Sequence, residues 1–153
     1  MTRILTTHIG SLPRPDDLAA LLRLRDAGSV TEGTAFEARV RSAVDDVVHR
    51  QVTAGLDIVN DGEQSKPDYS TYIKDRLTGF EGEPTSMPAG ADLKDFPAYA
   101  ARTRTAASER RPTCSGPLAW RDFDAVERDI RNLAGAAAAA GVKQAFMTAV
   151  SPG

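Results

Sequence analysis

The chain has 153 residues, of which 41% are hydrophobic and 26% charged, and its formal net charge is −2 at pH 7. This length fits one soluble domain with its own core, and the near balance of acids and bases excludes the strongly basic surface of nucleic-acid-binding proteins. No apolar run approaches the ~20 residues of a membrane helix, and the N-terminus lacks the apolar core of a signal peptide. The single cysteine, Cys114, cannot form an internal disulfide, so the sequence predicts a cytoplasmic protein.

The first half of the chain predicts two strands separated by two helices. Pro13 and Pro15 end the first strand, because proline lacks the amide that a sheet requires. Gly28 and Gly55 follow the two apolar periodic stretches as helix-ending glycines. In chain order, we expect a strand over Arg3–Thr7, helices over Leu18–Asp26 (capped by Asp16) and Thr31–Ala54, and a short β-type run over Leu56–Glu63 that ends in a polar turn.

The second half predicts a long connection followed by a strand, a helix and a strand. Residues 81–110 are rich in proline and glycine and predict an irregular loop insertion. The third strand region is Pro112–Trp120, and the fourth is Gln144–Val150. Between them an alanine-rich helix begins at Asp122 or Asp124 and reaches about Ala140, with its inner side formed by Ile130, Leu133, Ala134, Ala137 and Ala138.

Alternation of strands with helices is typical of α/β proteins with a parallel sheet. Ligands of such folds bind at the carboxyl ends of the strands. This rule selects His8, Ile9, Gly10 and Ser11 after the first strand, Asn60, Asp61 and Glu63 after the second, Ser115 and Trp120 after the third, and Ser151 after the fourth.

Two of these groups have chemistry suited to an amino acid. Asp61 and Glu63 lie on one side of an extended chain, and a carboxylate there can bind an ammonium group or act as an acid or base. Gly10 and Ser11 can offer N–H groups and a hydroxyl to a carboxylate. Both groups are equally compatible with simple turns, and His8 with either a ligand, a base or a packed residue.

Other common sites have no motif in this sequence. There is no CxxC, HxxxH or HExxH, so we expect no metal site in this chain, and no GxGxxG or GxxxxGK[ST] nucleotide loop. Cys114 has no partner base in sequence and is expected to be a small buried residue.

Two separated segments resemble the catalytic barrel of cobalamin-independent methionine synthases, above all the short single-barrel relatives. Thr6–Pro15 (TTHIGSLPRP) resembles the opening of that barrel, and Gln51–Glu63 (QVTAGLDIVNDGE) its second signature. Met147–Gly153 (MTAVSPG) resembles the end of its fourth strand. The resemblance implies that residues 1–153 form the N-terminal half of a single (β/α)₈ (TIM) barrel domain, with about four parallel strands and covering helices.

The resemblance also implies roles for these residues. Ile9, Gly10 and Ser11 would hold the amino-acid part of homocysteine, Glu63 would bind its amine, and His8, Asp61 and Ser151 would line the rim of the pocket. The intact enzyme would transfer a methyl group from a methyltetrahydrofolate-type donor to the homocysteine thiol, with zinc and without cobalamin. The family's zinc ligands and catalytic residues come from later strands, so this chain alone is expected to hold no metal and to be inactive.

Two alternatives stay open. One is a related zinc-dependent alkyltransferase acting on another thiol, such as an epoxyalkane:coenzyme M transferase. The other is an inactive half-barrel, or a half that a second polypeptide completes.

Overall fold

The computed structural model describes residues 3–29, 33–69, 72–85, 91–103 and 111–149. It divides into two compact units, one formed by Met1–Ser70 and Phe123–Gly153 and the other by Thr71–Asp122. In the part of the chain described, no helix is both long and apolar enough to cross a membrane.

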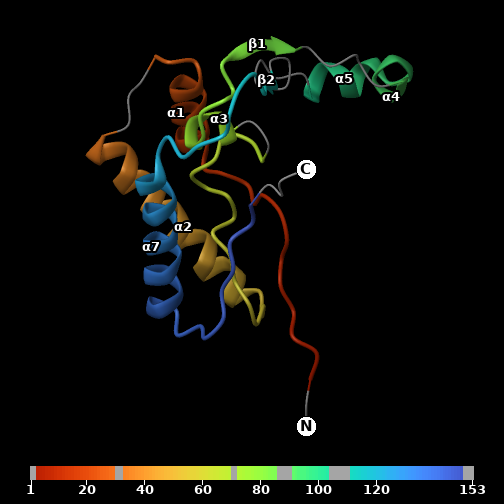
Figure 1. Cartoon of the computed structure of the whole chain (residues 1–153). Helices are drawn as coiled ribbons and strands as arrows, with labels where there is room; N and C mark the ends of the chain where they lie inside the picture. Colours follow the sequence, from red (N-terminus) through yellow and green to blue (C-terminus); the bar gives the residue numbers. More distant parts are fainter. Residues whose placement is uncertain (1–2, 30–32, 70–71, 86–90, 104–110, 150–153) are drawn as a thin grey trace. The chain divides into compact units, whose positions relative to one another are not determined.

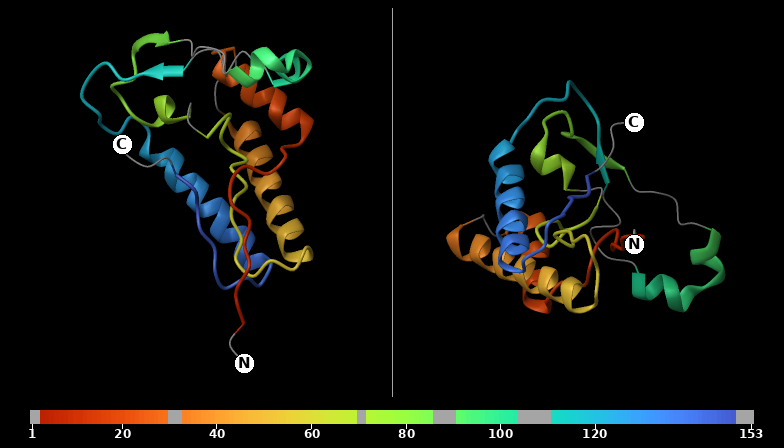
Figure 2. Two further views of the ribbon diagram at one scale, coloured as in Figure 1. Left: turned by 90° about the vertical axis from the view of Figure 1, so that its right-hand side faces the viewer. Right: turned by 90° about the horizontal axis from the view of Figure 1, so that it is seen from below.

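Three helices build the first unit and confirm the predicted ones to within a few residues. They are α1 (Asp16–Asp26), α2 (Thr34–Thr53) and α7 (Phe123–Ala139). Helices α2 and α7 pack against each other and cover one face of three extended segments (Figures 1 and 2). The apolar core between the helices and the middle segment consists of Leu18, Leu22, Phe36, Val40, Ala43, Val44, Val48, Val59, Leu133, Ala136 and Ala137.

The buried face of α7 differs from the predicted one. Leu133 and Ala137 are buried as expected, but the side chain of Ile130 is 51% exposed. Asp129, the preceding residue, is buried instead. The face of α7 that packs inward is therefore rotated about the helix axis by about one residue from the predicted face. The buried residues of the helix are Ala125, Asp129, Leu133, Ala136 and Ala137.

The three extended segments of the first unit correspond to the predicted first, second and fourth strands. Thr7 pairs in parallel with Ile58, and Val59 pairs in parallel with Ala145, so the second segment lies in the middle (red, yellow and blue in Figure 1). Each pairing is a single bridge, and no continuous strand forms over these described residues. The prediction of parallel segments is therefore right in direction, but the predicted strand lengths are wrong, and the second segment pairs directly with the fourth.

The side chain of Asp57 joins the first segment to the second. It accepts hydrogen bonds from the Thr6 amide (2.8 Å) and the Thr6 hydroxyl (3.1 Å), and it forms an ion pair with Arg3. These contacts lower the pKa of Asp57, the Thr6 amide contributing most. A side chain thus takes over part of the pairing that a regular ladder would supply.

The second unit contains short elements only. In chain order they are α3 (Ile73–Arg76), β1 (Gly82–Thr85), α4 (Ala91–Asp95), α5 (Pro97–Thr103) and β2 (Arg111–Thr113). Strands β1 and β2 pair antiparallel with an irregular register. Strand β1 and helix α4 lie within the 81–110 range expected to be an irregular loop, since elements this short leave no period that a sequence pattern could detect.

The predicted third strand, Pro112–Trp120, lies in the second unit and pairs antiparallel there. Its first residues belong to β2, and Trp120 forms an isolated antiparallel bridge with Leu77. Pro117 interrupts the run, since its missing amide prevents a continuous ladder. Cys114 follows β2 and is exposed, which corrects the expectation of a buried thiol.

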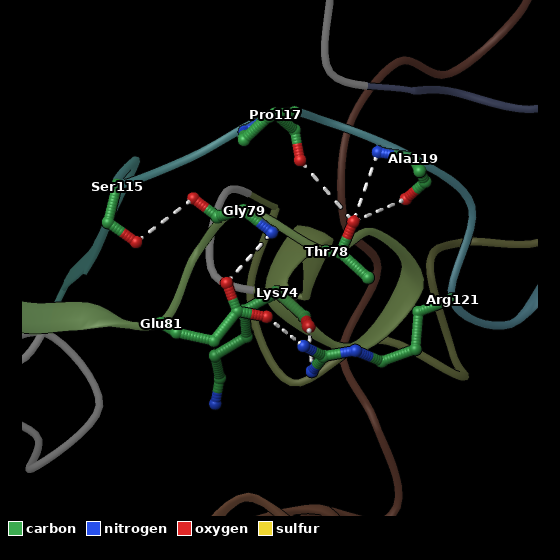
Figure 3. A network of polar contacts seen from close by, with 8 residues as sticks. All are labelled: Lys74, Thr78, Gly79, Glu81, Ser115, Pro117, Ala119 and Arg121. Atoms are coloured by element: carbon green, nitrogen blue, oxygen red, sulfur yellow. Dashed lines mark hydrogen bonds and ion pairs between the residues drawn. The ribbon is translucent and has the colours of Figure 1, made fainter.

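A polar network joins the segment that contains Thr78 and Gly79 to the segment that contains Ser115 and Ala119 (Figure 3). The Thr78 hydroxyl accepts from the Ala119 amide at 3.1 Å, and the Ser115 amide donates to the Gly79 carbonyl at 2.7 Å. Gly79 has a φ of 88°, and a Cβ there would lie 2.8 Å from the Gly116 and Pro117 carbonyl oxygens. Glycine is therefore required where the two chain segments approach most closely.

Candidate functional site

The Glu63 carboxylate is the centre of the candidate site in the first unit. Its side chain is buried, and the residue is only 1% exposed. The Ser11 hydroxyl donates to Oε2, and the Thr148 hydroxyl donates to Oε1 at 2.8 Å. Among the described residues, no lysine, arginine or histidine forms an ion pair with this carboxylate. A buried carboxylate whose oxygens are held by hydroxyl donors, and not by an ion pair, can accept a cationic ligand.

The backbone of Glu63 is in the left-handed region, with a φ of 56°. A residue with a Cβ adopts this conformation at a cost of roughly 1–2 kcal/mol, and such strain gathers at functional sites. Hydrogen bonds hold both backbone groups: the Glu63 amide donates to Oδ1 of Asp61 at 3.1 Å, and its carbonyl accepts from Nη2 of Arg14 at 2.8 Å. The turn thus directs the carboxylate by several independent contacts.

Asn60 links this turn to the end of the first segment. Its amide group donates to the His8 carbonyl at 2.7 Å, and its side-chain oxygen accepts from the Gly62 amide at 2.8 Å. Gln51 of α2 binds both backbone groups of Asn60, at 3.1 Å and 2.7 Å. The Gln51 side chain therefore satisfies the two backbone groups of Asn60, as a neighbouring strand would in a regular sheet.

Two further charged residues lie beside the carboxylate. Burial raises the pKa of Asp61, and the charge of Lys66 opposes that rise. Burial likewise lowers the pKa of the Arg14 guanidinium, while the charges of Glu63, Asp68 and Asp61 oppose the shift. Arg14 stays the cation of this turn, but it donates to a backbone oxygen of Glu63 and not to the carboxylate.

The structure brings some of the predicted site residues together. Ser11 touches Glu63, and Asp61 holds the Glu63 amide. Gly10 has a φ of 94°, a conformation that favours glycine, and its carbonyl lies 3.1 Å from Nε2 of the half-buried His8. These residues form one group around the turn.

The group described above does not include Ile9 or Ser151. Ile9 is 75% exposed, so its side chain does not contribute to a buried site. Ser151 lies outside the described residues.

Three contributors to the site were not predicted from the sequence. Thr148 lies inside the predicted fourth strand, Gln144–Val150, so a rule that selects residues beyond strand ends did not select it. Arg14 and Lys66 lie in polar stretches with no pattern that distinguishes them from surface residues.

No group of three or more histidine, cysteine, aspartate and glutamate side chains that could hold a metal ion occurs among the described residues. His8 lies in the first unit and Cys114 in the second.

Comparison with known proteins gives matches concentrated in the first part of the chain. A methionine synthase of Sulfurisphaera tokodaii is 38% identical over 76 residues, which are 50% of this chain and 22% of that protein. A methionine synthase of Sulfolobus acidocaldarius is 38% identical over 81 residues, 53% of this chain and 24% of that protein. A 5-methyltetrahydropteroyltriglutamate–homocysteine methyltransferase of Streptomyces avermitilis is 35% identical over 75 residues, 49% of this chain and 10% of that protein.

The matched part thus covers less than a quarter of the length of each of these relatives. A solved structure from Listeria monocytogenes, provisionally named a vitamin-B12 independent methionine synthase, covers 90% of this chain and 49% of its own at 17% identity. Its TM-score of 0.36 is too low to support a comparison of folds.

The family model described as "Cobalamin-independent synthase, Catalytic domain" matches residues 4–87, which include Ser11, the Asn60–Glu63 turn and Lys66. Because this match covers more than half of the 153 residues, the chain belongs to the cobalamin-independent synthase family.

Proposed function

We propose that this chain provides the amino-acid-binding half of a methyltransferase site in which homocysteine is converted to methionine. The methyl donor would be of the methyltetrahydrofolate type, and the reaction would not use cobalamin. The single observation that carries the proposal is the buried Glu63 carboxylate, held by the Ser11 and Thr148 hydroxyls without an ion pair among the described residues. Membership of the family supports the reaction class.

The charge of the site favours an amino thiol as substrate. A buried carboxylate attracts the ammonium group of homocysteine, whereas it would repel the sulfonate of coenzyme M. Two cations lie near the acid, and they donate to carbonyl oxygens: Arg14 to that of Glu63 and Lys66 to that of Thr148. The proposal therefore places homocysteine ahead of coenzyme M.

The proposal includes a larger assembly. The three parallel segments would form part of a (β/α)₈ barrel, and the zinc that activates the thiol would be held by residues outside this group, in a longer protein or a second polypeptide. Cys114, a single exposed thiol, fits a reducing compartment such as the cytoplasm.

Titration of the full chain with L-homocysteine under reducing conditions tests the proposal. We expect the amide signals of Gly10, Ser11 and Glu63 to shift in nuclear magnetic resonance spectra. 4-Mercaptobutanoate, which lacks the amine, and coenzyme M should bind more weakly.

The variant Glu63→Gln should weaken homocysteine binding by about 10- to 100-fold, since hydrogen bonds to charged groups contribute about 1.5–3 kcal/mol. Glu127→Gln, an exposed substitution on α7, is the control. Equal binding of homocysteine and coenzyme M, or an unchanged affinity of Glu63→Gln, would contradict the proposal.

A further inference from the structure

Thr148 makes a contact with Glu63 that extends the site beyond its two predicted segments. Its hydroxyl donates to Oε1 of Glu63 at 2.8 Å, across 85 positions of sequence. Ser11 donates to the other oxygen, Oε2. The carboxylate is therefore held at both oxygens, by residues that follow two different extended segments.

Thr148 is itself held by the segment that carries Glu63. Nζ of Lys66 donates to the Thr148 carbonyl at 2.7 Å, and Lys66 is only 3% exposed. The Tyr69 hydroxyl donates to the neighbouring Ala149 carbonyl at 3.2 Å. These two side chains fix the backbone of 148–149, and thereby the position of the Thr148 hydroxyl.

The choice of donors matters for charge. A hydroxyl orients a carboxylate without neutralising it, so the lone pairs left on both oxygens stay available to a cation. The Lys66 ammonium, which could neutralise Glu63 if it reached the carboxylate, donates to a carbonyl of Thr148. Lys66 thus fixes the backbone of a residue whose hydroxyl donates to the acid.

We propose that Thr148 is a positioning residue that, together with Ser11, orients the Glu63 carboxylate toward the ammonium group of an amino-acid substrate, and that Lys66 holds Thr148 in place. This inference rests on the proposed function, because it assigns the acid an ammonium ligand. The inference adds the segment that carries Thr148 to the two segments, around Ser11 and Glu63, on which recognition of the amine would depend.

Two variants of Thr148 test the inference in the full chain. Thr148→Val keeps the shape of the side chain and removes the hydroxyl, while Thr148→Ser keeps the hydroxyl. We expect Thr148→Val to weaken L-homocysteine binding about tenfold, the effect of one hydrogen bond to a charged group. Binding of 4-mercaptobutanoate should stay unchanged, and Thr148→Ser should restore homocysteine affinity to within about threefold of the unsubstituted chain.

A measurement without ligand separates positioning from function. The carbon-13 resonance of the Glu63 carboxyl carbon should move in Thr148→Val and in Lys66→Met, and should stay near its original position in Thr148→Ser. If the unsubstituted chain binds no homocysteine, the proposed function fails, and the inference as an account of amine recognition fails with it.

Two results would overturn the inference alone, with homocysteine still bound by the unsubstituted chain. One is an unmoved Glu63 carboxyl resonance in Thr148→Val. The other is an equal loss of affinity for homocysteine and 4-mercaptobutanoate, which would show that Thr148 supports the fold and not the amine site.

Discussion

Ser11 and Glu63 lie 52 positions apart in the sequence and are joined by a hydrogen bond from the Ser11 hydroxyl to Oε2 of the carboxylate. Ser11 is exposed, whereas Glu63 is buried. A ligand that binds Oε2 of this acid would therefore share that oxygen with the Ser11 hydroxyl.

Removal of the Ser11 hydroxyl should weaken binding. In Ser11→Ala, Oε2 of Glu63 loses its donor, and we expect homocysteine affinity to fall about three- to tenfold. Isothermal titration of the full chain measures the change, with Ser42→Ala, on the exposed side of α2, as the matched control. An affinity equal to that of the control would remove Ser11 from the site.

Gln51 should be important for stability, because it satisfies both backbone groups of the buried Asn60. In Gln51→Leu, these groups lose their partners, and the free energy of unfolding should fall by about 2–4 kcal/mol. Urea unfolding followed by circular dichroism measures the loss. Gln144→Leu changes an exposed side chain and should alter stability by less than about 0.5 kcal/mol. Equal stabilities of the two variants would contradict the role assigned to Gln51.

Two features favour glycine at position 62: a positive φ and close neighbouring side chains. Comparison with Gly28, which has only the positive φ, separates their effects. The φ of Gly62 is 59°, and a Cβ there would lie 3.1 Å from the Leu12 Cβ and 3.2 Å from the Val47 Cγ2. Gly62→Ala should destabilise the chain by about 2–4 kcal/mol, the sum of backbone strain and overpacking. Gly28 has a φ of 72° with open space around it, so Gly28→Ala should cost only about 1 kcal/mol. Thermal unfolding of both variants checks the difference, and equal melting temperatures would count against crowding at the turn.

Asp61 should make stability depend on pH. Burial raises the pKa of Asp61 in the folded chain. At pH values between the unfolded and the folded pKa, the folded chain therefore keeps the Asp61 proton and the unfolded chain has released it. The contribution of Asp61 is therefore fully present below the ordinary aspartate pKa of about 3.9 and is lost as pH rises through the higher folded value.

Asp61→Asn removes this titration and keeps an oxygen that can accept from the Glu63 amide. The stability of the variant relative to the unsubstituted chain should rise as pH increases from 4 toward 7, as measured by urea unfolding at a series of pH values. A difference that stays constant with pH would show that Asp61 does not titrate in this way.

Strong periodicity made the helices of the first unit predictable. The bounds of α1, α2 and α7 follow apolar spacing and terminal glycines, and these signals are local. The exposed Ile130 shows the limit, since a stripe of apolar residues does not decide which of two adjacent faces packs inward.

The second unit offered no comparable signal. Its strands β1 and β2 are four and three residues long, and their pairing depends on contacts such as that between Ser115 and Gly79, which no local pattern encodes. Within the site, the strand-end rule found Ser11 and Glu63 because both follow β-type runs. It could not find Arg14, whose role arises only when the Pro13–Pro15 loop folds back on the Glu63 carbonyl.

The contact between Thr148 and Glu63 has a consequence for the order in which the molecule forms. Closing a loop of 85 residues costs more chain entropy than closing a helix turn, so local helices can form well before this contact. During synthesis, α1 and α2 leave the ribosome long before residue 148 does. The helical scaffold can therefore exist while the acid still lacks one of its two hydroxyl donors, and we expect the candidate site to be completed late in folding.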